Sequence, residues 1–391
     1  VVGIMRLTRR QWLGTAAATI GCDGTVSQRS DPVRRDRHDR NLRSARSPSG
    51  HALLEERIPS LRLNHLALGV FPTPCQHARD LSRRIELDLW VKRDDLASGV
   101  FGGRKVRKLE LLLAEAKALK RGRVITFGGA GSNQCLATAL FAPRAGLQAS
   151  VMLSPQPRSE HVARQLRMLA ATQAEIGFSK EVGSAEVTAM TAMRRDAAAP
   201  HVLPAGGTSA LGNLAFVAAA LELDAQIRSG MLPEPAWLVI AAGTLGSAVG
   251  LCLGLAITKR KTRVLAVRAS SAHYSNPGRA RALYGETARL IAQDSVPALD
   301  PYRLVFESRE LGAGYGRSTR NGEHAAHMAA DLEGYRLEPT YTQKALAAVL
   351  RKDRLCSTGP LLLWLTQSAV LPAEAKRPMQ RLPAQLHSYL R

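Results

Sequence analysis

The chain has 391 residues, of which 45% are hydrophobic and 22% are charged. This length and composition exclude a single small domain and fit a two-lobed enzyme with a hydrophobic core. Five cysteines without paired spacing indicate neither a disulfide framework nor a zinc knuckle, so we expect no metal site. The formal charge of +22 invites a nucleic-acid interpretation. The basic residues are dispersed, however, and aromatic residues make up only 5%, so we expect no nucleic-acid partner.

The N-terminal residues have the pattern of an export signal. Residues 8–13 read TRRQWL, which resembles the twin-arginine signature, and the uncharged stretch after them is too short to span a bilayer. Ile20-Gly21-Cys22 is similar to a lipoprotein cleavage box, which makes Cys22 a candidate for lipidation and membrane anchoring. We therefore expect residues 1–26 to be an export signal and the protein to be periplasmic or anchored to the inner membrane. A disordered basic leader on a cytoplasmic protein is the alternative.

Two segments of different composition follow the signal. From Ser27 to Gly50 it is mostly Arg, Asp and Ser, which predicts a disordered basic linker over residues 27–60. From about Leu66 onward, strand and helix patterns alternate, which predicts an α/β fold with a parallel sheet covered by helices. Periodicity predicts strands at 87–92, 123–127 and 149–153, and helices at 104–120 and 132–145.

One uncharged segment, from Ala236 to Ile257, has two interpretations. Taken alone, it fits a transmembrane helix with a face of glycines spaced four apart. We favour a buried strand over 237–240, a turn over 241–247 and a helix from Ala248, because alternating elements continue on both sides. A glycine-rich turn before a helix N-terminus is an arrangement that binds phosphate.

Eight segments in order resemble the family of 1-aminocyclopropane-1-carboxylate (ACC) deaminase and D-cysteine desulfhydrase, over residues 66–369. They are FPTP (71–74), LWVKRDD (89–95), FGGRKVRKLE (101–110), GSNQ (131–134), PAGG (204–207), the turn at Gly243, AGYG (313–316) and EPTYTQKA (338–345). The resemblance implies a pyridoxal-phosphate (PLP) enzyme of fold type II, similar to the tryptophan synthase β chain, with two domains, three αβα layers and parallel sheets. Its boundaries would be a large PLP-binding domain over 61–108 and 201–375, a small domain over 109–200 and a C-terminal tail over 376–391.

The resemblance also implies roles for individual residues. Lys105 would form the Schiff base with pyridoxal 5'-phosphate, and Ser132 and Asn133 would contact the cofactor or the substrate carboxylate. The catalytic set would be Lys105, Ser132, Tyr315 and Tyr341, with both tyrosines facing the substrate. The cofactor would be held by Lys105 and Asn133, by a phosphate turn of Gly243, Thr244, Leu245, Gly246 and Ser247, and by Thr342 facing the pyridine nitrogen.

Physical chemistry supports some of these assignments. Lys105 opens a helix, and the positive helix end with Arg104, Arg107 and Lys108 predicts a lowered pKa for its amine, as a Schiff-base nucleophile needs. Ser132 stands at a helix start and also fits an N-cap, and the two roles are compatible. Thr342 fits an N-cap in the same way, while tyrosines in turns are commonly packing residues.

The chain departs from the family pattern at several positions. The family usually has Asn at Arg104, Gln at Gly131, a glycine or other small residue at Leu245, and two glycines at Gln367-Ser368. These departures leave the fold intact. They leave open the identity of the substrate and the catalytic power of the site.

The expected reaction is α,β-elimination from a small amino acid, with D-cysteine converted to pyruvate, sulfide and ammonia as the first candidate. Thr342, where the deaminase branch carries Glu, favours the desulfhydrase branch. The alternatives are ACC deaminase activity and a catalytically degraded, exported binding protein of the same fold. We expect a small amino acid as the substrate partner and a homodimer.

Overall fold

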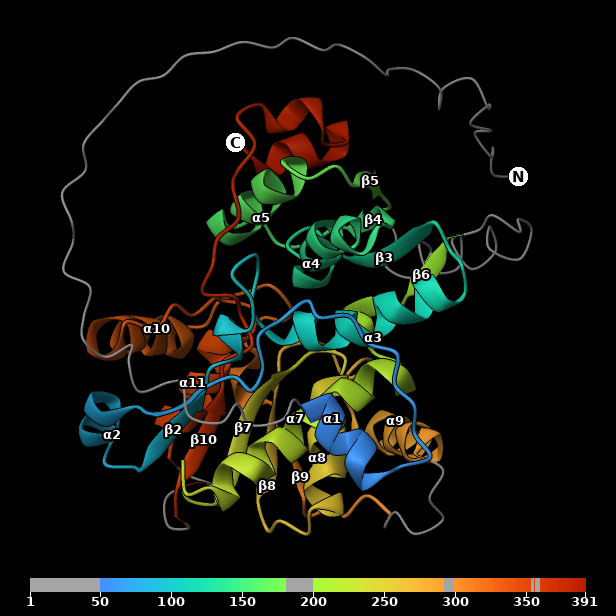
Figure 1. Ribbon diagram of the computed structural model, residues 1–391. Coiled ribbons are helices and arrows are strands. Elements are labelled where there is room, and N and C mark those ends of the chain that lie inside the picture. Colours follow the sequence, from blue (N-terminus) through green and yellow to red (C-terminus); the bar gives the residue numbers. More distant parts are fainter. Residues whose placement is uncertain (1–49, 181–199, 292–297, 353–354, 356–358) are drawn as a thin grey trace, which may run out of the picture. The chain divides into compact units, whose positions relative to one another are not determined.

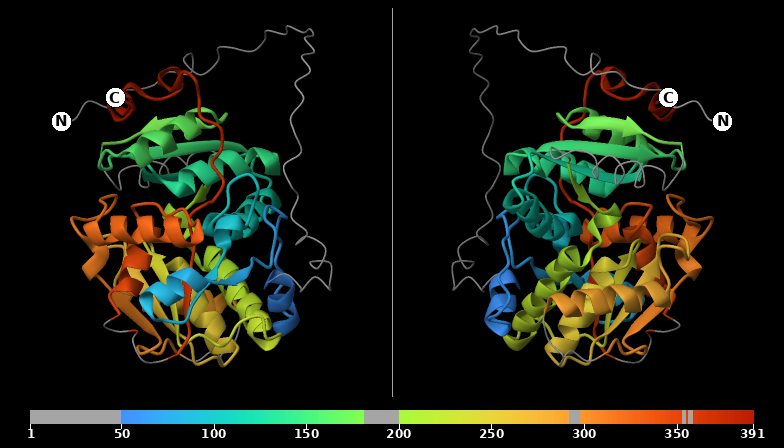
Figure 2. Two further views of the ribbon diagram at one scale, coloured as in Figure 1. Left: turned by 90° about the vertical axis from the view of Figure 1, so that its left-hand side faces the viewer. Right: turned by 90° about the vertical axis from the view of Figure 1, so that its right-hand side faces the viewer.

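The computed structural model describes residues 50–180, 200–291, 298–352, 355 and 359–391, which belong to one compact unit (Figure 1). The predicted export signal, Cys22 and most of the predicted linker lie outside these residues. Within them, the chain builds a large lobe and a small lobe, each around one sheet (Figure 2).

The large lobe contains a six-stranded sheet that is parallel except at one edge. Across the sheet the strands are β1 (Cys75–His77), β2 (Leu89–Lys92), β10 (Leu361–Trp364), β7 (Trp237–Ala242), β8 (Arg263–Arg268) and β9 (Leu304–Glu307). Only β1 runs antiparallel to its neighbour. Successive side chains of a strand point to opposite faces. Leu238 and Ile240 of β7 therefore enter one core cluster, whereas Val239 and Ala241 enter another.

Helices cover both faces of this sheet, which confirms the predicted three-layer αβα arrangement. One face packs against α1 (Gly50–Arg57), α7 (Ala210–Arg228), α8 (Gly246–Ile257) and α9 (Pro277–Leu290). The other face packs against α2 (Arg79–Ile85), α10 (Arg320–Glu333) and α11 (Thr342–Leu350). Both core clusters are almost entirely aliphatic, so burial of apolar surface stabilises the lobe.

The small lobe contains a parallel four-stranded sheet. Its strands, in spatial order, are β5 (Glu175–Phe178), β4 (Gln148–Ser154), β3 (Arg123–Gly129) and β6 (His201–Leu203). It packs against α3 (Arg104–Ala118), α4 (Asn133–Phe141) and α5 (Glu160–Ala170). The helix predicted over 132–145 ends earlier, because Pro143 cannot continue the α-helical hydrogen bonding and begins a 3₁₀ turn. Further 3₁₀ turns occupy Asp94–Leu96, Ala205–Gly207, Arg309–Leu311, Pro378–Gln380 and Ala384–Tyr389.

The domain boundaries differ from the predicted ones in three places. The linker expected over 27–60 does not extend through α1, because Leu54 of this helix is fully buried and α1 packs against α7. β6 belongs to the small sheet, although residues from 201 onward were expected in the large domain. The expected tail, residues 376–391, packs on the small lobe through the buried side chains of Leu382 and Leu386.

The apolar segment from Ala236 to Ile257 contains β7, a turn and α8, as favoured over a transmembrane helix. Among the described helices, α7 is long and apolar enough to cross a membrane by composition, but 78% of that stretch is buried in the fold. Packing against the sheet and α8 therefore accounts for the apolar character of α7.

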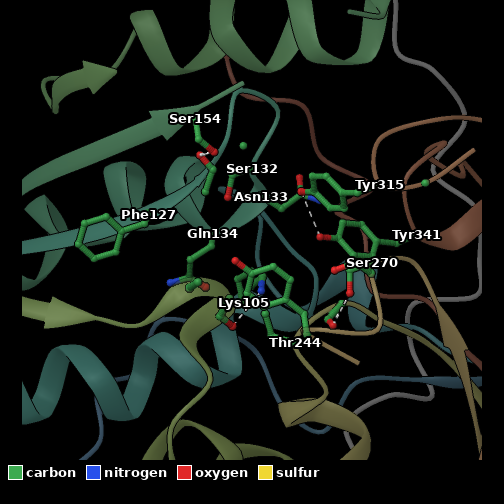
Figure 3. A pocket seen from close by; sticks show the side chains of 18 of the residues that line it. Lys105, Phe127, Ser132, Asn133, Gln134, Ser154, Thr244, Ser270, Tyr315 and Tyr341 are labelled. Atoms are coloured by element: carbon green, nitrogen blue, oxygen red, sulfur yellow. Dashed lines mark hydrogen bonds between the residues drawn. The ribbon is translucent and has the colours of Figure 1, made fainter. Parts of the chain in front are cut away.

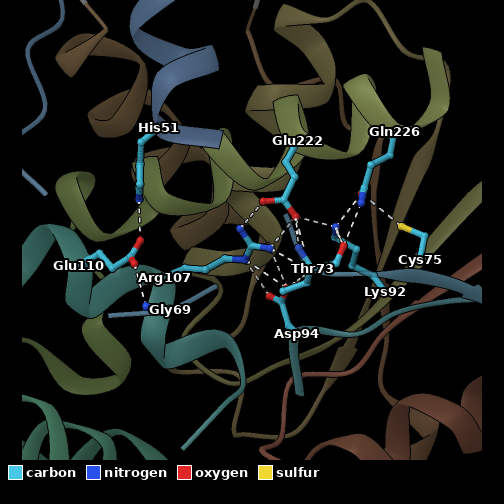
Figure 4. Close-up of polar contacts among 10 residues, drawn as sticks. All are labelled: His51, Gly69, Thr73, Cys75, Lys92, Asp94, Arg107, Glu110, Glu222 and Gln226. Carbon is cyan, nitrogen blue, oxygen red and sulfur yellow. Dashed lines mark hydrogen bonds and ion pairs between the residues drawn. The ribbon is translucent and has the colours of Figure 1, made fainter. Parts of the chain in front are cut away.

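A buried ion network joins α3 to the large lobe (Figure 4). Arg107 of α3 donates to Asp94 Oδ1 at 2.8 Å and to Glu222 Oε2 at 2.9 Å, and Lys92 Nζ donates to Glu222 Oε1 at 2.6 Å. Burial opposes ionisation of Glu222, but Arg107 and Lys92 outweigh it and lower the pKa of this carboxyl to about 2. Since losing one partner would leave a buried charge unpaired, the network fixes α3 against β2 and α7.

Candidate active site

A cavity of about 400 Å³ lies at the carboxyl ends of β3 and β7, where ligands bind in open parallel sheets (Figure 3). Both lobes line it. The lining includes Arg104, Lys105, Phe127, Ser132, Asn133, Gln134, Gly206, Gly243, Thr244, Ser270, Tyr274, Tyr315 and Tyr341. The structure thus brings together Lys105, Ser132, Asn133, Gly243, Thr244, Tyr315 and Tyr341, which the sequence analysis selected from distant segments.

Lys105 reaches the cavity because of the turn that precedes α3. Gly103 has φ +87°, and a Cβ there would lie 2.5 Å from the backbone oxygen of Thr366, so only glycine fits before the helix. Lys105 is 7% exposed, and its Nζ donates to the backbone oxygen of Gly206 at 3.0 Å. Burial, and then the charges of Arg104 and Lys108, lower the pKa of Lys105 well below its usual value. A neutral amine is the form that can attack a carbonyl or accept a proton.

The predicted contribution of Arg107 to this pKa is wrong. Its guanidinium points into the ion network of Asp94 and Glu222 and does not line the cavity. Residues two apart on a helix point in nearly opposite directions, so Arg107 faces the large-lobe core, while Lys105 and Lys108, three apart, share the other face.

The expected phosphate turn forms a recess beside the cavity. Gly243 and Thr244 line both spaces, whereas Leu245, Gly246 and Ser247 line only the recess. α8 begins at Gly246 without a side-chain cap, so its first N–H groups are available to an anion.

Lys108 also lines the recess, and the sequence analysis did not select it for the site. Its Nζ lies 3.3 Å from Thr208 Oγ1, and a Cβ on Gly246 would approach it to 2.8 Å. Burial, and then Arg104, lower the pKa of Lys108 to about 7. The sequence spacing could have identified Lys108 as a site residue, because it follows Lys105 by three residues on the same helix and therefore shares its face.

The charge balance of these residues fits a phosphate-bearing cofactor. Arg104, Lys105 and Lys108 surround the two spaces, and of the residues that the structure describes, no Asp or Glu lines either one. Arg104 is a buried cation without a counter-charge in this lining, and an anion beside Lys108 would favour the protonated form of that amine, so an anion with several oxygens is the matching ligand. PLP has such a group on a carbonyl-bearing ring, and Lys105 is the amine beside it.

Ser132 and Asn133 stand where β3 gives way to α4. The Ser132 hydroxyl accepts a hydrogen bond from the N–H of Cys135 at 3.3 Å, so Ser132 caps the helix while lining the cavity. The Asn133 side chain is fixed on two sides: its Nδ2 donates to Gln367 Oε1 at 2.7 Å, and its Oδ1 accepts from Gln165 Nε2 at 2.6 Å. Gln367, one of the departures from the family pattern, thus positions Asn133.

Tyr315 and Tyr341 lie beside each other in the cavity (Figure 3). The Tyr341 hydroxyl donates to the Tyr315 hydroxyl at 3.3 Å, which leaves the Tyr315 proton available to a ligand. Burial raises the pKa of both phenols, well above the usual value for Tyr315, so they remain neutral. The guanidinium of Arg104 stacks on the Tyr341 ring at 4.5 Å and donates to the backbone oxygen of Ala241 at 2.7 Å.

The expected role of Thr342 does not agree with the structure. Its hydroxyl accepts from the N–H of Glu338 at 2.8 Å, its side chain is 1% exposed, and it lines neither the cavity nor the recess. Thr342 therefore ties the chain before α11 to the first residue of the helix; it is not the N-cap that the sequence also allowed, because Tyr341 stands at that position and no side chain caps the helix there. Ser270 and Tyr274 of the lining were missed, because no motif singled them out and only the fold brings them to the cavity.

Comparisons with known proteins agree with this site. Residues 66–367 match the family described as pyridoxal-phosphate dependent enzyme. The D-cysteine desulfhydrases of Klebsiella pneumoniae and Salmonella schwarzengrund are each 30% identical over 318 residues, which cover 79% of this chain and 95% of each relative. The crystal structure of an ACC deaminase homologue matches with a TM-score of 0.70 and 26% identity, covering 86% of this chain and all of that one. The chain therefore belongs to the family of pyridoxal-phosphate-dependent enzymes that includes D-cysteine desulfhydrase and ACC deaminase.

Proposed function

We propose that this enzyme catalyses α,β-elimination from a small amino acid with a good leaving group on its β carbon, with D-cysteine as the first candidate. The observation that carries the proposal is the pairing of the buried Lys105 amine with the neutral Tyr315–Tyr341 pair in one cavity, whose lining contains no carboxylate among the residues that the structure describes. For D-cysteine, the overall reaction with water gives pyruvate, hydrogen sulfide and ammonia.

The residues that would hold the cofactor follow from the site. Lys105 would anchor it covalently, while Lys108 and the N–H groups at the start of α8 would hold its phosphate. When bound, PLP supplies a conjugated ring that withdraws electrons from the substrate α carbon. The protein supplies orientation and proton transfer.

Proton transfer would involve Lys105 and Tyr315. When the substrate has taken the place of Lys105 on the cofactor, the freed Lys105 amine, whose pKa is lowered by burial and by Arg104, would accept the α proton at Nζ. Tyr315, whose hydroxyl accepts from Tyr341, donates a proton to the departing sulfur. The electron pair of the broken C–H bond forms the new double bond as the C–S bond breaks, so charge balances within the cavity.

The absence of a carboxylate from the described lining favours elimination over ring opening of ACC. A carboxylate beside the pyridine nitrogen would stabilise its protonated form and make the ring a stronger electron acceptor. Expulsion of a thiol needs less electron withdrawal than cleavage of a carbon–carbon bond. Thr342 has no part in this preference, because it lines neither the cavity nor the recess.

The test is product formation by the purified holoenzyme. Pyruvate and sulfide released from D-cysteine are compared with 2-oxobutanoate released from ACC, and Lys105→Ala is the inactive control. We expect turnover of D-cysteine and little or none of ACC. Preference for ACC would contradict the proposal, and activity on neither substrate in a protein that retains the cofactor would favour a degraded binding protein.

A further inference from the structure

A second cavity, of about 130 Å³, lies between the lobes. Its walls are one face of α5 in the small lobe, the segment from Arg336 to Pro339 in the large lobe, and part of the connecting segment near Gln367. It shares no lining residue with the catalytic cavity. The mechanism above does not use it.

Buried polar atoms line this cavity without hydrogen-bond partners in the protein. Gln165 is 2% exposed, and its Nε2 donates to Asn133, but its Oε1 has no partner. The Nε2 atom of His161 is also buried without a hydrogen bond, and its nearest carboxylate oxygen, on Glu338, is 3.9 Å away. A buried polar atom that has lost its water and found no partner destabilises the fold. A ligand that supplies a donor to Gln165 would remove part of this destabilisation.

The charged groups of the cavity favour a ligand with a carboxylate. Arg336 is exposed and forms no ion pair with any described residue, and Arg164 makes only long contacts with carboxylates, at 3.6 Å and 3.8 Å. Glu338, in contrast, is engaged, because it accepts hydrogen bonds from the N–H groups of residues 340, 341 and 342. The Arg336 guanidinium is therefore free to bind an anion, and the longer ion pairs of Arg164 leave its guanidinium able to contribute a second contact.

The volume limits the ligand to a small molecule. An engineered cavity of roughly 150 Å³ accommodates benzene, which has about six heavy atoms. Alanine, serine and cysteine are of this size. The cavity also has apolar wall area from Met168 and Leu337, which suits a short side chain.

We propose that this inter-lobe cavity is a binding site for a small zwitterionic amino acid, distinct from the catalytic site. Its carboxylate binds Arg336 and Arg164, its ammonium group donates to Gln165 Oε1, and its side chain packs on Met168. Because Gln165 also donates to Asn133 of the catalytic cavity, a ligand that fixes the Gln165 amide also fixes Asn133. The two sites are therefore coupled, and coupling of binding is reciprocal.

The test is calorimetric titration of holoenzyme whose cofactor has been fixed to the protein by borohydride, so that substrates cannot react. The probes are L-alanine, propionate, which lacks the ammonium group, and n-propylamine, which lacks the carboxylate. We expect saturable binding of alanine and at least tenfold weaker binding of the other two. No binding of alanine would overturn the proposal. Equally tight binding of propionate would do so as well, because it would indicate an unspecific anion site.

Two variants test whether alanine binds in the inter-lobe cavity or in the catalytic cavity. Arg336→Gln removes the free charge at an exposed position, so the fold should be retained, and alanine should bind at least tenfold more weakly. The matched control is Arg320→Gln, an exposed arginine at the start of α10 outside both cavities, which should bind alanine as the unmodified protein does. If Arg336→Gln binds alanine normally, the ligand sits in the catalytic cavity and the second site does not exist.

Discussion

At the scale of single residues, Lys105 and Lys108 lie on one face of α3 and are both buried, yet only one should carry the cofactor. Lys105 lines the main cavity, whereas Lys108 lines only the phosphate recess. We expect borohydride to fix the cofactor to Lys105, as mapped by mass spectrometry of peptides. Lys105→Ala should abolish the adduct, and Lys108→Ala should weaken cofactor binding but retain it. An adduct on Lys108 in the unmodified protein would contradict the site geometry.

Arg104, where the family usually has Asn, places a positive charge beside Lys105. The charge lowers the pKa of the Lys105 amine, after the larger effect of burial. Arg104→Asn should therefore raise that pKa, and the pH at which the visible absorbance of the bound cofactor changes should move upward. Arg104→Lys keeps the charge and serves as the control. A transition at the same pH in Arg104→Asn would mean that Arg104 acts only through its stacking on Tyr341.

At the scale of elements, the turn between β7 and α8 contains a strained residue. Leu245 has φ +68°, in the left-handed region that costs a non-glycine residue roughly 1–2 kcal/mol, and its side chain is buried. The packing of this leucine offsets the strain, which explains how the turn keeps its shape without the usual small residue.

This strain predicts an inverted order of stability at position 245. Leu245→Ala removes the packing but keeps the backbone strain. Leu245→Gly also removes the packing, but it relieves the strain, because glycine adopts a positive φ without cost. The glycine variant should therefore be more stable than the alanine variant by about 1 kcal/mol in urea unfolding. Leu253 lies inside α8 and serves as the control. There, the alanine variant should be more stable than the glycine variant by about 1 kcal/mol, as is usual in a helix. If the alanine variant were the more stable one at both positions, the backbone at residue 245 would be unstrained.

At the scale of the whole molecule, stability should depend on pH through the buried lysines. The pKa of Lys108 is about 7 in the folded protein and about 10.4 in an unfolded chain. Between these values the unfolded state binds more protons, so stability of the cofactor-free protein should rise with pH in this window. Lys108→Met removes this contribution. Urea midpoints at pH 7 and pH 9 should differ less in Lys108→Met than in the unmodified protein. If the two midpoints differed equally in Lys108→Met and in the unmodified protein, the pH dependence of stability would come from other groups.

We also propose that the protein is exported through its N-terminal residues. The signature around Arg9 and Arg10 supports this, and it lies outside the described residues. Changing both arginines to lysine should keep the protein in the cytoplasm, as measured by cell fractionation and immunoblotting. An unchanged periplasmic or membrane fraction would refute the proposal.

Local sequence determined the elements and the central residue of the site. Alternating periodicities predict β3, β4 and α3 within a few residues, because each pattern reflects the face that its own element buries. The motif around Lys105 was informative for a similar reason, since Gly103, Lys105 and Lys108 belong to one turn and one helix face. These features depend on neighbours in the chain, which the sequence shows directly.

Tertiary structure decided where side chains point when their partners are far away in the chain. Arg107 faces Glu222, Asn133 is held by Gln165 and Gln367, and α1 packs on α7, all across long sequence separations. The hydroxyl of Thr342 is turned away from the cavity, because it accepts a hydrogen bond from the backbone N–H of Glu338. A sequence states which groups can form hydrogen bonds or carry charge. Which partner each buried group meets depends on packing of the two lobes, because a buried polar group must be satisfied by whatever the fold places beside it.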